Sequence, residues 1–247
     1  MIKKIKSIIN EFRANNKQIC LRLSELENQN RELEWSQIYH DSIRGKKWIE
    51  ELHLNVGRWA GNYSFFYVLN RILSDYKPMS ILDLGLGESS KFISAYLENY
   101  LFESNHTIVE QSEDWINMFL LNNSLSSRSN IIFCPLKEVE IKGHISNSYN
   151  GFDEKITKKF DLYIVDGPFG SLKYSRYDII SKIEEFNCGD EFIILFDDTH
   201  RQGEKDTIED IIKILNNKKI EFFISNYVGN KTNSVISTKK YRFAISL

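Results

Sequence analysis

Three carboxylate residues, Asp166, Asp197 and Asp198, directly follow two short apolar segments of the chain, FDLYIVDG and EFIILFDD. If these segments are neighbouring strands of a parallel sheet, the three carboxylates share one cluster, where like charges repel and raise one another's pKa. A hard divalent cation such as Mg²⁺, Mn²⁺ or Ca²⁺ prefers oxygen ligands and removes that repulsion. We therefore predict a metal site at Asp166, Asp197 and Asp198.

His200 lies two residues beyond the acidic pair. An imidazole at this place can be a fourth ligand of the cation, or the general base that takes the proton of a substrate hydroxyl. The cation itself could hold two neighbouring hydroxyls and lower the pKa of the one that attacks. His200 and Asp166 are the candidate catalytic residues, and an ordinary surface histidine is the alternative for His200. Nearby basic residues could contact a phosphate or form a solvated face: Lys173, Arg176 and Arg201.

A glycine turn, Gly85-Leu86-Gly87, follows another apolar segment and precedes a helical pattern. Glycines at this point permit a tight turn and close approach of the backbone to a ligand. The run is a near match to the dinucleotide-binding fingerprint, with Ser90 in place of its third glycine. Glu110 ends the next apolar segment, where a carboxylate can accept both hydroxyls of a ribose. The glycine turn and Glu110 together suit either a nicotinamide dinucleotide or S-adenosylmethionine.

From Met79 onward, short apolar segments alternate with helical patterns, which predicts a parallel, doubly wound α/β sheet covered on both faces. Ligands bind such sheets outside the carboxyl ends of the strands, where the residues above lie. The last two predicted strands, KIEFFISNYV and YRFAISL, have only the loop GNKTNSVISTKK between them, so we expect a terminal antiparallel hairpin. Residues 140–159 are polar and irregular, and predict an inserted loop.

Residues 2–33 carry a heptad repeat that no Pro or Gly interrupts. A seven-residue repeat of this length predicts a left-handed coiled coil, and Asn16 and Asn30 on the seam can fix its register and favour a parallel dimer. Arg22 and Glu27 occupy flanking positions that can pair between chains. We expect a homodimer through this arm; a helix packed on its own domain is one alternative, and a membrane-surface helix is another, because residues 1–22 are basic. The seam comprises Ile2, Ile5, Ile9, Phe12, Asn16, Ile19, Leu23, Leu26, Asn30 and Leu33.

The chain divides by pattern into a coiled-coil arm (1–34), a helical connector or cap (35–78) and a main domain (79–247). The connector is rich in aromatic residues, which pack on the main domain or, for Trp59, Tyr63 and Ser64, help to close a ligand pocket. Its turn WAGNYS precedes a predicted helix, SFFYVLNRIL.

Charge and cysteine usage limit the classes of function. The 247 residues have a formal net charge of −2, so no basic footprint for nucleic acid is present. Three scattered cysteines without zinc-ligand spacing predict a reducing, cytoplasmic compartment. No apolar run approaches the roughly 18 residues that span a bilayer. We therefore expect a cytoplasmic protein without a transmembrane segment.

Residues 75–247 resemble the class I S-adenosylmethionine-dependent methyltransferases. Asp83-x-Gly85-x-Gly87 matches their glycine motif, Glu110 matches their ribose-binding acid, and Ser89 stands where the family often has a third glycine. The resemblance implies a Rossmann-like seven-stranded sheet with a terminal hairpin, the glycine turn under the methionine part of the cofactor and Glu110 on its ribose. Gln111 or Trp115 would lie near the adenine. The cofactor-binding residues it implies are Asp83, Gly85, Gly87, Ser89, Glu110, Gln111, Trp115 and Asp166.

The acidic cluster is similar to that of metal-dependent O-methyltransferases of the catechol type and of bacterial sugar methyltransferases from capsule and antibiotic pathways. VDGPFG is similar to a segment of polysaccharide-modifying methyltransferases, including those that act on plant glucuronoxylan. The resemblance implies an O-methyltransferase for a hydroxyl of a sugar or nucleotide-sugar, in bacterial capsule or surface polysaccharide biosynthesis.

Two competing functions stay open. The glycine turn alone permits a nicotinamide-dependent oxidoreductase, although Asp83 before the first glycine, Glu88 at the helix start and the lack of a helical Tyr-x-x-x-Lys pair disfavour it. A non-catalytic coiled-coil scaffold with a vestigial cofactor pocket is the other alternative. The carboxylates at the strand ends disfavour loss of the site.

Overall fold

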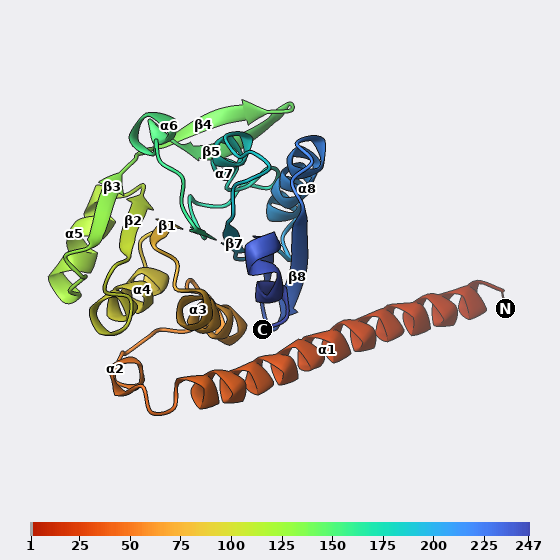
Figure 1. Cartoon of the computed structure of the whole chain (residues 1–247). Coiled ribbons are helices and arrows are strands. Elements are labelled where there is room, and N and C mark those ends of the chain that lie inside the picture. The colour runs from red at the N-terminus through yellow and green to blue at the C-terminus, as the bar shows by residue number, and fades with distance from the viewer. Residues whose placement is uncertain (1) are drawn as a thin grey trace.

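The main body is an α/β sandwich around a seven-stranded sheet of order β3-β2-β1-β6-β7-β9-β8 (Figure 1). The computed structural model describes residues 2–247 and, of the side chains, those of residue 6 and residues 9–247. Five strands pair in parallel, and β9 is antiparallel to both β7 and β8, so six of the seven strands share one direction. The predicted sheet with a terminal hairpin is confirmed. The strands are β1 (Ser80–Leu84), β2 (Asn105–Glu110), β3 (Ser129–Phe133), β6 (Leu162–Val165), β7 (Ile193–Phe196), β8 (Phe222–Val228) and β9 (Thr232–Thr238).

Helices cover both faces because alternate residues of the central strands point to opposite sides. Ile81 of β1 packs with α3 (Tyr63–Tyr76) and α4 (Glu88–Asn99), whereas Leu82 packs with α7 (Ile179–Glu184) and α8 (Gln202–Asn217). The central strands are buried on both faces, as their continuous apolar runs predict. The helix α5 (Glu113–Asn122) covers β2 and β3 near the sheet edge.

The predicted positions of the last strands need correction. The final strand is β9, within the segment predicted as a loop, and YRFAISL belongs to a 3₁₀ helix, η1 (Lys239–Ile245). Polar residues fill β9, which hides it from a hydropathy pattern, but they are buried with partners: Asn233 Nδ2 donates to Ser64 Oγ at 2.8 Å and Ser234 Oγ to Thr199 Oγ1 at 2.8 Å. In η1, the buried residues are Tyr241 and Ala244, three apart, a helical rather than a strand spacing.

The segment 140–159 is also ordered rather than an irregular loop. The antiparallel hairpin of β4 (Leu136–Ile141) and β5 (His144–Tyr149) is followed by the short helix α6 (Phe152–Lys155). Lys142 and Gly143 form its turn with φ of +52° and +81°, the sign that a tight two-residue hairpin requires. The hairpin lies over the loop after β6, since the N–H of Asn147 donates to Ser171 Oγ at 2.8 Å.

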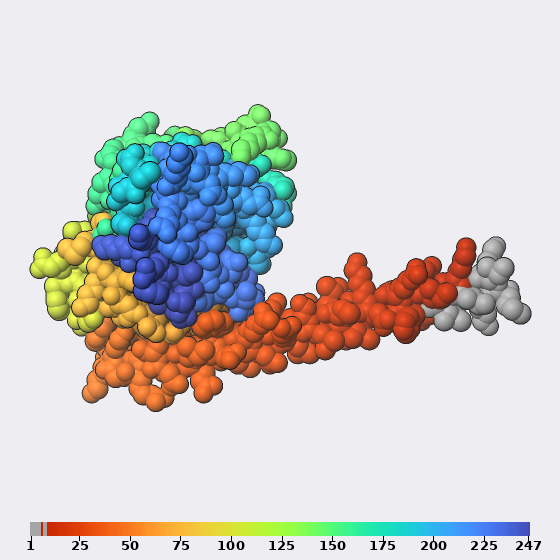
Figure 2. Space-filling view, turned by 45° about the vertical axis from the view of Figure 1, so that its right-hand side comes forward, coloured from red at the N-terminus to blue at the C-terminus, as the bar shows by residue number. Residues whose placement is uncertain are grey.

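The arm is one continuous helix, α1 (Ile2–Ile43), which crosses the proposed division at residue 34 and is followed by the short helix α2 (Lys47–Glu50). Its C-terminal part packs on the main body through Glu32, Trp35, Tyr39 and Ile43, spaced three or four residues apart. Its N-terminal part projects from the body as a rod (Figure 2). The heptad residues Ile2 and Ile5 lie outside the described side chains. No helix of the described chain has the length and apolar character to cross a membrane.

Candidate functional site

The parallel register aligns the carboxyl ends of four adjacent strands. Leu84 of β1 pairs with Val109 of β2 and Val165 of β6, and Val165 pairs with Phe196 of β7. The sheet order reverses at β1, and this is the place where doubly wound sheets bind their ligands. The structure therefore brings the residues predicted from sequence to one edge: Gly85, Glu110, Asp166 and Asp197 each follow one of these positions.

The glycine turn packs closely on one side and is open on the other. Gly85 has a φ of +108°, which only glycine adopts readily, and a Cβ there would lie 3.4 Å from the backbone nitrogen of Gly167. A Cβ on Gly87 would meet no described atom within 4 Å. A ligand can therefore approach the backbone at Gly87, while Gly85 is held against the turn after β6.

Asp83 lies beneath this turn and is completely buried. Its carboxylate accepts hydrogen bonds from Ser89 Oγ at 3.1 Å and Ser90 Oγ at 2.7 Å, and His106 Nε2 lies 3.5 Å away. The two serines belong to the first turn of α4. Asp83 and Ser89, both predicted as cofactor-binding residues, thus hold the start of α4 against β1 and shape the turn from within.

Glu110 connects the glycine turn to α5. Its Oε2 accepts the N–H of Leu86 at 3.0 Å, and its Oε1 accepts the N–H groups of Gln111 at 2.8 Å and Ser112 at 2.9 Å. Burial raises the pKa of Glu110, against the lowering effect of these three donors. Oε2 accepts only one hydrogen bond and keeps lone-pair capacity for a further donor such as a ribose hydroxyl.

Gln111 and Trp115 border the same turn. Trp115 Nε1 donates to the carbonyl oxygen of Leu86 at 2.7 Å, and its side chain is 39% exposed. Gln111 Oε1 accepts the N–H of Phe169 at 3.3 Å. Glu110 and Trp115 therefore hold Leu86 from its two sides, and the indole keeps an accessible surface.

The three aspartates form one cluster, with one oxygen from each within 4.8 Å of the others. The buried Arg176 lies among them, with Nη2 at 3.0 Å from Asp166 Oδ1 and 3.0 Å from Asp198 Oδ2. Lys231 Nζ lies 3.6 Å from Asp197 Oδ2 and 3.4 Å from Asp198 Oδ1. These two side chains neutralise part of the charge for which the sequence predicts a metal. Arg176 is therefore an internal counter-ion, neither a phosphate contact nor part of a solvated face.

The members of the cluster titrate differently. Burial raises the pKa of Asp166 to about 8, although Arg176 acts to lower it. Burial and the neighbouring Asp198 also raise the pKa of Asp197. Burial acts to raise the pKa of Asp198 as well, but Arg176, Lys231 and Arg201 together outweigh it and lower that pKa. Asp166 is the most accessible of the three, with 20% of its side chain exposed, so a substrate can reach it.

The cluster has oxygen atoms that can act as ligands of a hard divalent cation. Both carboxylate oxygens of Asp197 and Oδ1 of Asp198 are buried and accept no hydrogen bond from any described residue. Buried carboxylate oxygens without donors are costly, and oxygen ligands of this kind suit Mg²⁺, Mn²⁺ or Ca²⁺. Asp166 completes a set of three.

His200 is exposed and stands outside this set of three. Its Nδ1 accepts the N–H of Thr232 at 3.3 Å, and burial of part of the ring lowers its pKa. In a neutral imidazole whose Nδ1 accepts, the proton is on Nε2, so the free nitrogen is a donor. The geometry therefore favours Asp166 over His200 as a base.

The connector of residues 35–78 borders the cluster of Asp166, Asp197 and Asp198. Lys231 Nζ donates to the carbonyl oxygen of Ala60 at 2.9 Å, and the buried Ser64 supports Asn233 of β9. Trp59 lies on the same loop and is 93% exposed. The loop thus adjoins the acidic cluster through Lys231, with an indole that is free of packing.

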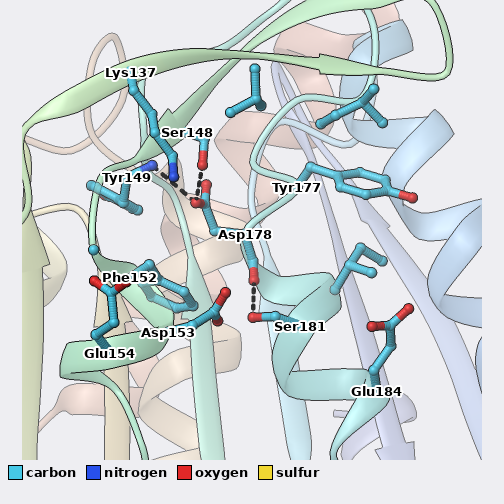
Figure 3. A pocket seen from close by; sticks show the side chains of 14 residues that line it. Lys137, Ser148, Tyr149, Phe152, Asp153, Glu154, Tyr177, Asp178, Ser181 and Glu184 are labelled. Atoms are coloured by element: carbon cyan, nitrogen blue, oxygen red, sulfur yellow. Dashed lines mark hydrogen bonds between the residues drawn. The ribbon is translucent and has the colours of Figure 1, made fainter.

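A separate cavity of about 360 Å³ lies between the β4–β5 hairpin, α6 and α7 (Figure 3). Ser148 Oγ and the N–H of Tyr149 donate to Asp178 Oδ1 at 2.6 and 2.9 Å at its upper side. The Tyr149 hydroxyl reaches inward and donates to the carbonyl oxygen of Val109 at 3.3 Å. None of the site residues predicted from sequence lines this cavity.

Comparison with solved structures identifies the fold. The O-methyltransferase TomG from Streptomyces achromogenes, in complex with S-adenosylmethionine, has a TM-score of 0.50 at 11% identity over 83% of this chain and 89% of that one. Complexes of S-adenosylhomocysteine with an O-methyltransferase from Bacillus cereus (TM-score 0.46, 11% identity, 82% and 91% covered) and with methyltransferase PaMTH1 from Podospora anserina (0.42, 13%, 83% and 87%) are also similar. No family model matches the chain, and no curated protein matches it.

The likeness to TomG and the strand order show the Rossmann-like fold of the class I S-adenosylmethionine-dependent methyltransferases. The glycine motif and Glu110 predict this fold from the sequence.

Several residues of the site carry no clear sequence signal. Lys231 lies in a segment predicted as a loop, and its role follows only from the true position of β9. Arg176 is one of three basic residues noted near the cluster, and only the folded chain shows that it is buried.

Proposed function

We propose that the protein is an S-adenosylmethionine-dependent O-methyltransferase. The observation that carries this proposal is the adjacency, at one sheet edge, of an open glycine turn with a buried ribose-type acid and a carboxylate cluster. Glu110 and the turn at Gly85–Gly87 would bind the cofactor, and Asp166 lies on the neighbouring strand end. The protein's main task is to hold donor and acceptor at attack distance.

Asp166 is our assigned base, and His200 is the second candidate. As the acceptor oxygen bonds to the methyl carbon, the carbon–sulfur bond breaks and its electron pair stays on sulfur. The hydroxyl proton passes to the carboxylate of Asp166, whose pKa is about 8 in the protein without a bound cation. The products are the methyl ether and S-adenosylhomocysteine.

Asp166, Asp197 and Asp198 would hold a divalent cation. A bound Mg²⁺, Mn²⁺ or Ca²⁺ would orient two hydroxyls and lower the pKa of one. The carboxylate oxygens of Asp197 and Asp198 that accept no hydrogen bond support this assignment. Arg176 and Lys231 already supply part of the positive charge that such a cation would bring to the cluster.

The acceptor we propose is a hydroxyl of a sugar or nucleotide-sugar, in bacterial capsule or surface polysaccharide biosynthesis in the cytoplasm. The oxygen-rich acidic site supports a polyhydroxylated acceptor, and so does the exposed Trp59 on the loop whose Ala60 carbonyl binds Lys231, because aromatic faces pack well on sugar rings. We further propose a second copy of the chain as partner through the heptad of residues 2–33.

Incubation with methyl-labelled S-adenosylmethionine and a panel of nucleotide-sugars, with and without EDTA, tests the reaction. We expect label on at least one sugar, and loss of transfer after chelation that Mn²⁺ or Mg²⁺ restores. Full transfer after exhaustive chelation would reject the cation and leave Asp166 as a metal-independent base.

A further inference from the structure

Glu32 lies in the arm, yet its carboxylate binds two segments of the main body. Its Oε1 accepts the N–H of Tyr63 at 2.8 Å, and its Oε2 accepts from Asn62 Nδ2 at 2.7 Å and from the N–H of Asn230 at 2.9 Å. These donors come from the start of α3 and from the turn between β8 and β9. A Cβ on Gly229 would lie 2.2 Å from Oε2, so the close approach of Glu32 requires a glycine there.

The same two segments hold Lys231 at the acidic cluster. Lys231 directly follows Asn230, its Nζ donates to Ala60 of the loop before Asn62, and it lies within 3.6 Å of Asp197. Only 12% of its side chain is exposed. Glu32 therefore fixes both the backbone that carries Lys231 and the loop that accepts its ammonium group.

We propose that Glu32 is a positioning residue for the methyl-transfer site: it sets where Lys231 stands relative to Asp197 and Asp198. The inference rests on the proposed function of that site. Hydrogen bonds to a carboxylate are stronger than neutral ones, and here three of them converge on one side chain. The arm is thus part of the site's support.

A simple docking contact makes a different prediction, and Trp35 provides the comparison. Trp35 Nε1 donates to the carbonyl oxygen of Val228 at 2.9 Å, which fastens α1 to the last residue of β8, next to the turn that carries Lys231 but without a hydrogen bond to Tyr63, Asn62 or Asn230. If Glu32 only docks the arm, then Trp35→Phe and Glu32→Gln should have similar effects on the site.

The test uses the full chain with Glu32→Gln, with Trp35→Phe as the docking control and Glu34→Gln as the exposed charge control. A glutamine amide cannot accept at both former oxygen positions. Acetylation of Lys231 by an N-hydroxysuccinimide ester, followed by mass spectrometry, reports its protection without any substrate. We expect the labelling rate to rise about tenfold in Glu32→Gln alone, because charge-assisted hydrogen bonds are lost.

Methyl transfer to the sugar identified from the panel is the second readout. We expect kcat to fall about tenfold in Glu32→Gln, with unchanged affinity for S-adenosylmethionine, since the defect concerns placement at the cluster. Unchanged Lys231 labelling, or equal effects in Trp35→Phe, would overturn the proposal. A wild-type protein without methyl transfer would reject the proposed function, and the labelling of Lys231 would still decide whether Glu32 holds it.

Discussion

Glu110 is the residue on which the cofactor assignment most directly depends. Its buried carboxylate faces the glycine turn and holds the N–H of Leu86, so it both shapes the turn and presents acceptor oxygens beside it. The sequence predicts its position, because a carboxylate at the end of the second strand is visible without a structure. The internal role of Asp83 is not visible, since the serines that bind it are ordinary helix-start residues.

Glu110→Ala should weaken binding of S-adenosylmethionine by roughly 100-fold, because hydrogen bonds to a charged group contribute about 1.5–3 kcal/mol each. Titration calorimetry measures this directly. Glu113→Gln, at the exposed start of α5, is the control and should bind as the wild type does. An unchanged dissociation constant in Glu110→Ala would remove Glu110 from the cofactor site.

The raised pKa of Asp166 predicts a pH-dependent stability of the metal-free protein. Its ordinary value is 3.8 and its folded value about 8, so between these values the folded state keeps a proton that the unfolded state has lost. The free energy of unfolding should therefore fall as pH rises from about 4 to 8, by at most about 1.4 kcal/mol per pH unit from this group. Asp166→Asn should flatten the slope in urea titrations with EDTA present. The same slope in that variant would contradict the assignment.

At the scale of elements, the sequence predicts those whose pattern agrees with their burial. The five parallel strands are apolar runs, and α3 begins at the predicted WAGNYS turn. β9 escapes prediction because its buried polar residues are satisfied by partners distant in sequence, such as Ser64 for Asn233. The β4–β5 hairpin escapes it because a polar strand with one exposed face resembles a loop.

The N-terminus of α3 is an element boundary with a measurable contribution. Asn62 Oδ1 accepts the N–H of Phe65 at 3.2 Å, and its Nδ2 donates to Glu32. Asn62→Ala should lower the free energy of unfolding by about 2 kcal/mol, since both a helix cap and a buried partner are lost. Chemical denaturation checks this, with Asn117→Ala on the exposed face of α5 as control. A loss no larger than in the control would show that the cap contributes little.

At the scale of the whole molecule, α1 uses two faces for two purposes. Glu32, Trp35 and Tyr39 face the main body, while the described part of the heptad seam, from Ile9 to Leu33, stays exposed, with 64% of Phe12 and 70% of Leu33 accessible. An exposed apolar stripe on a projecting helix is typical of an interface. The heptad repeat is visible in the sequence. The face that packs on the main body is not, because it consists of only a few residues, such as Glu32, Trp35 and Tyr39, on the same helix.

A parallel, in-register dimer would place residue 15 of one chain beside residue 20 of the other. In a Cys188→Ser background, Asn15→Cys should therefore cross-link through the exposed Cys20 on oxidation, and Cys20 alone should not. Light scattering should give a dimer for this chain and a monomer for one that starts at Trp35. Equal masses for both chains would reject the coil as an interface, and cross-linking of Cys20 alone would indicate antiparallel helices.

Titration calorimetry of the full chain with S-adenosylmethionine and, separately, with NAD most directly tests the central claim. We predict binding of S-adenosylmethionine at one site per chain and none of NAD. Gly85→Val should abolish that binding in a folded protein, because a branched side chain at a φ of +108° would distort the turn against Gly167. Binding of NAD, or no heat with S-adenosylmethionine in the wild-type protein, would contradict the assignment as a methyltransferase.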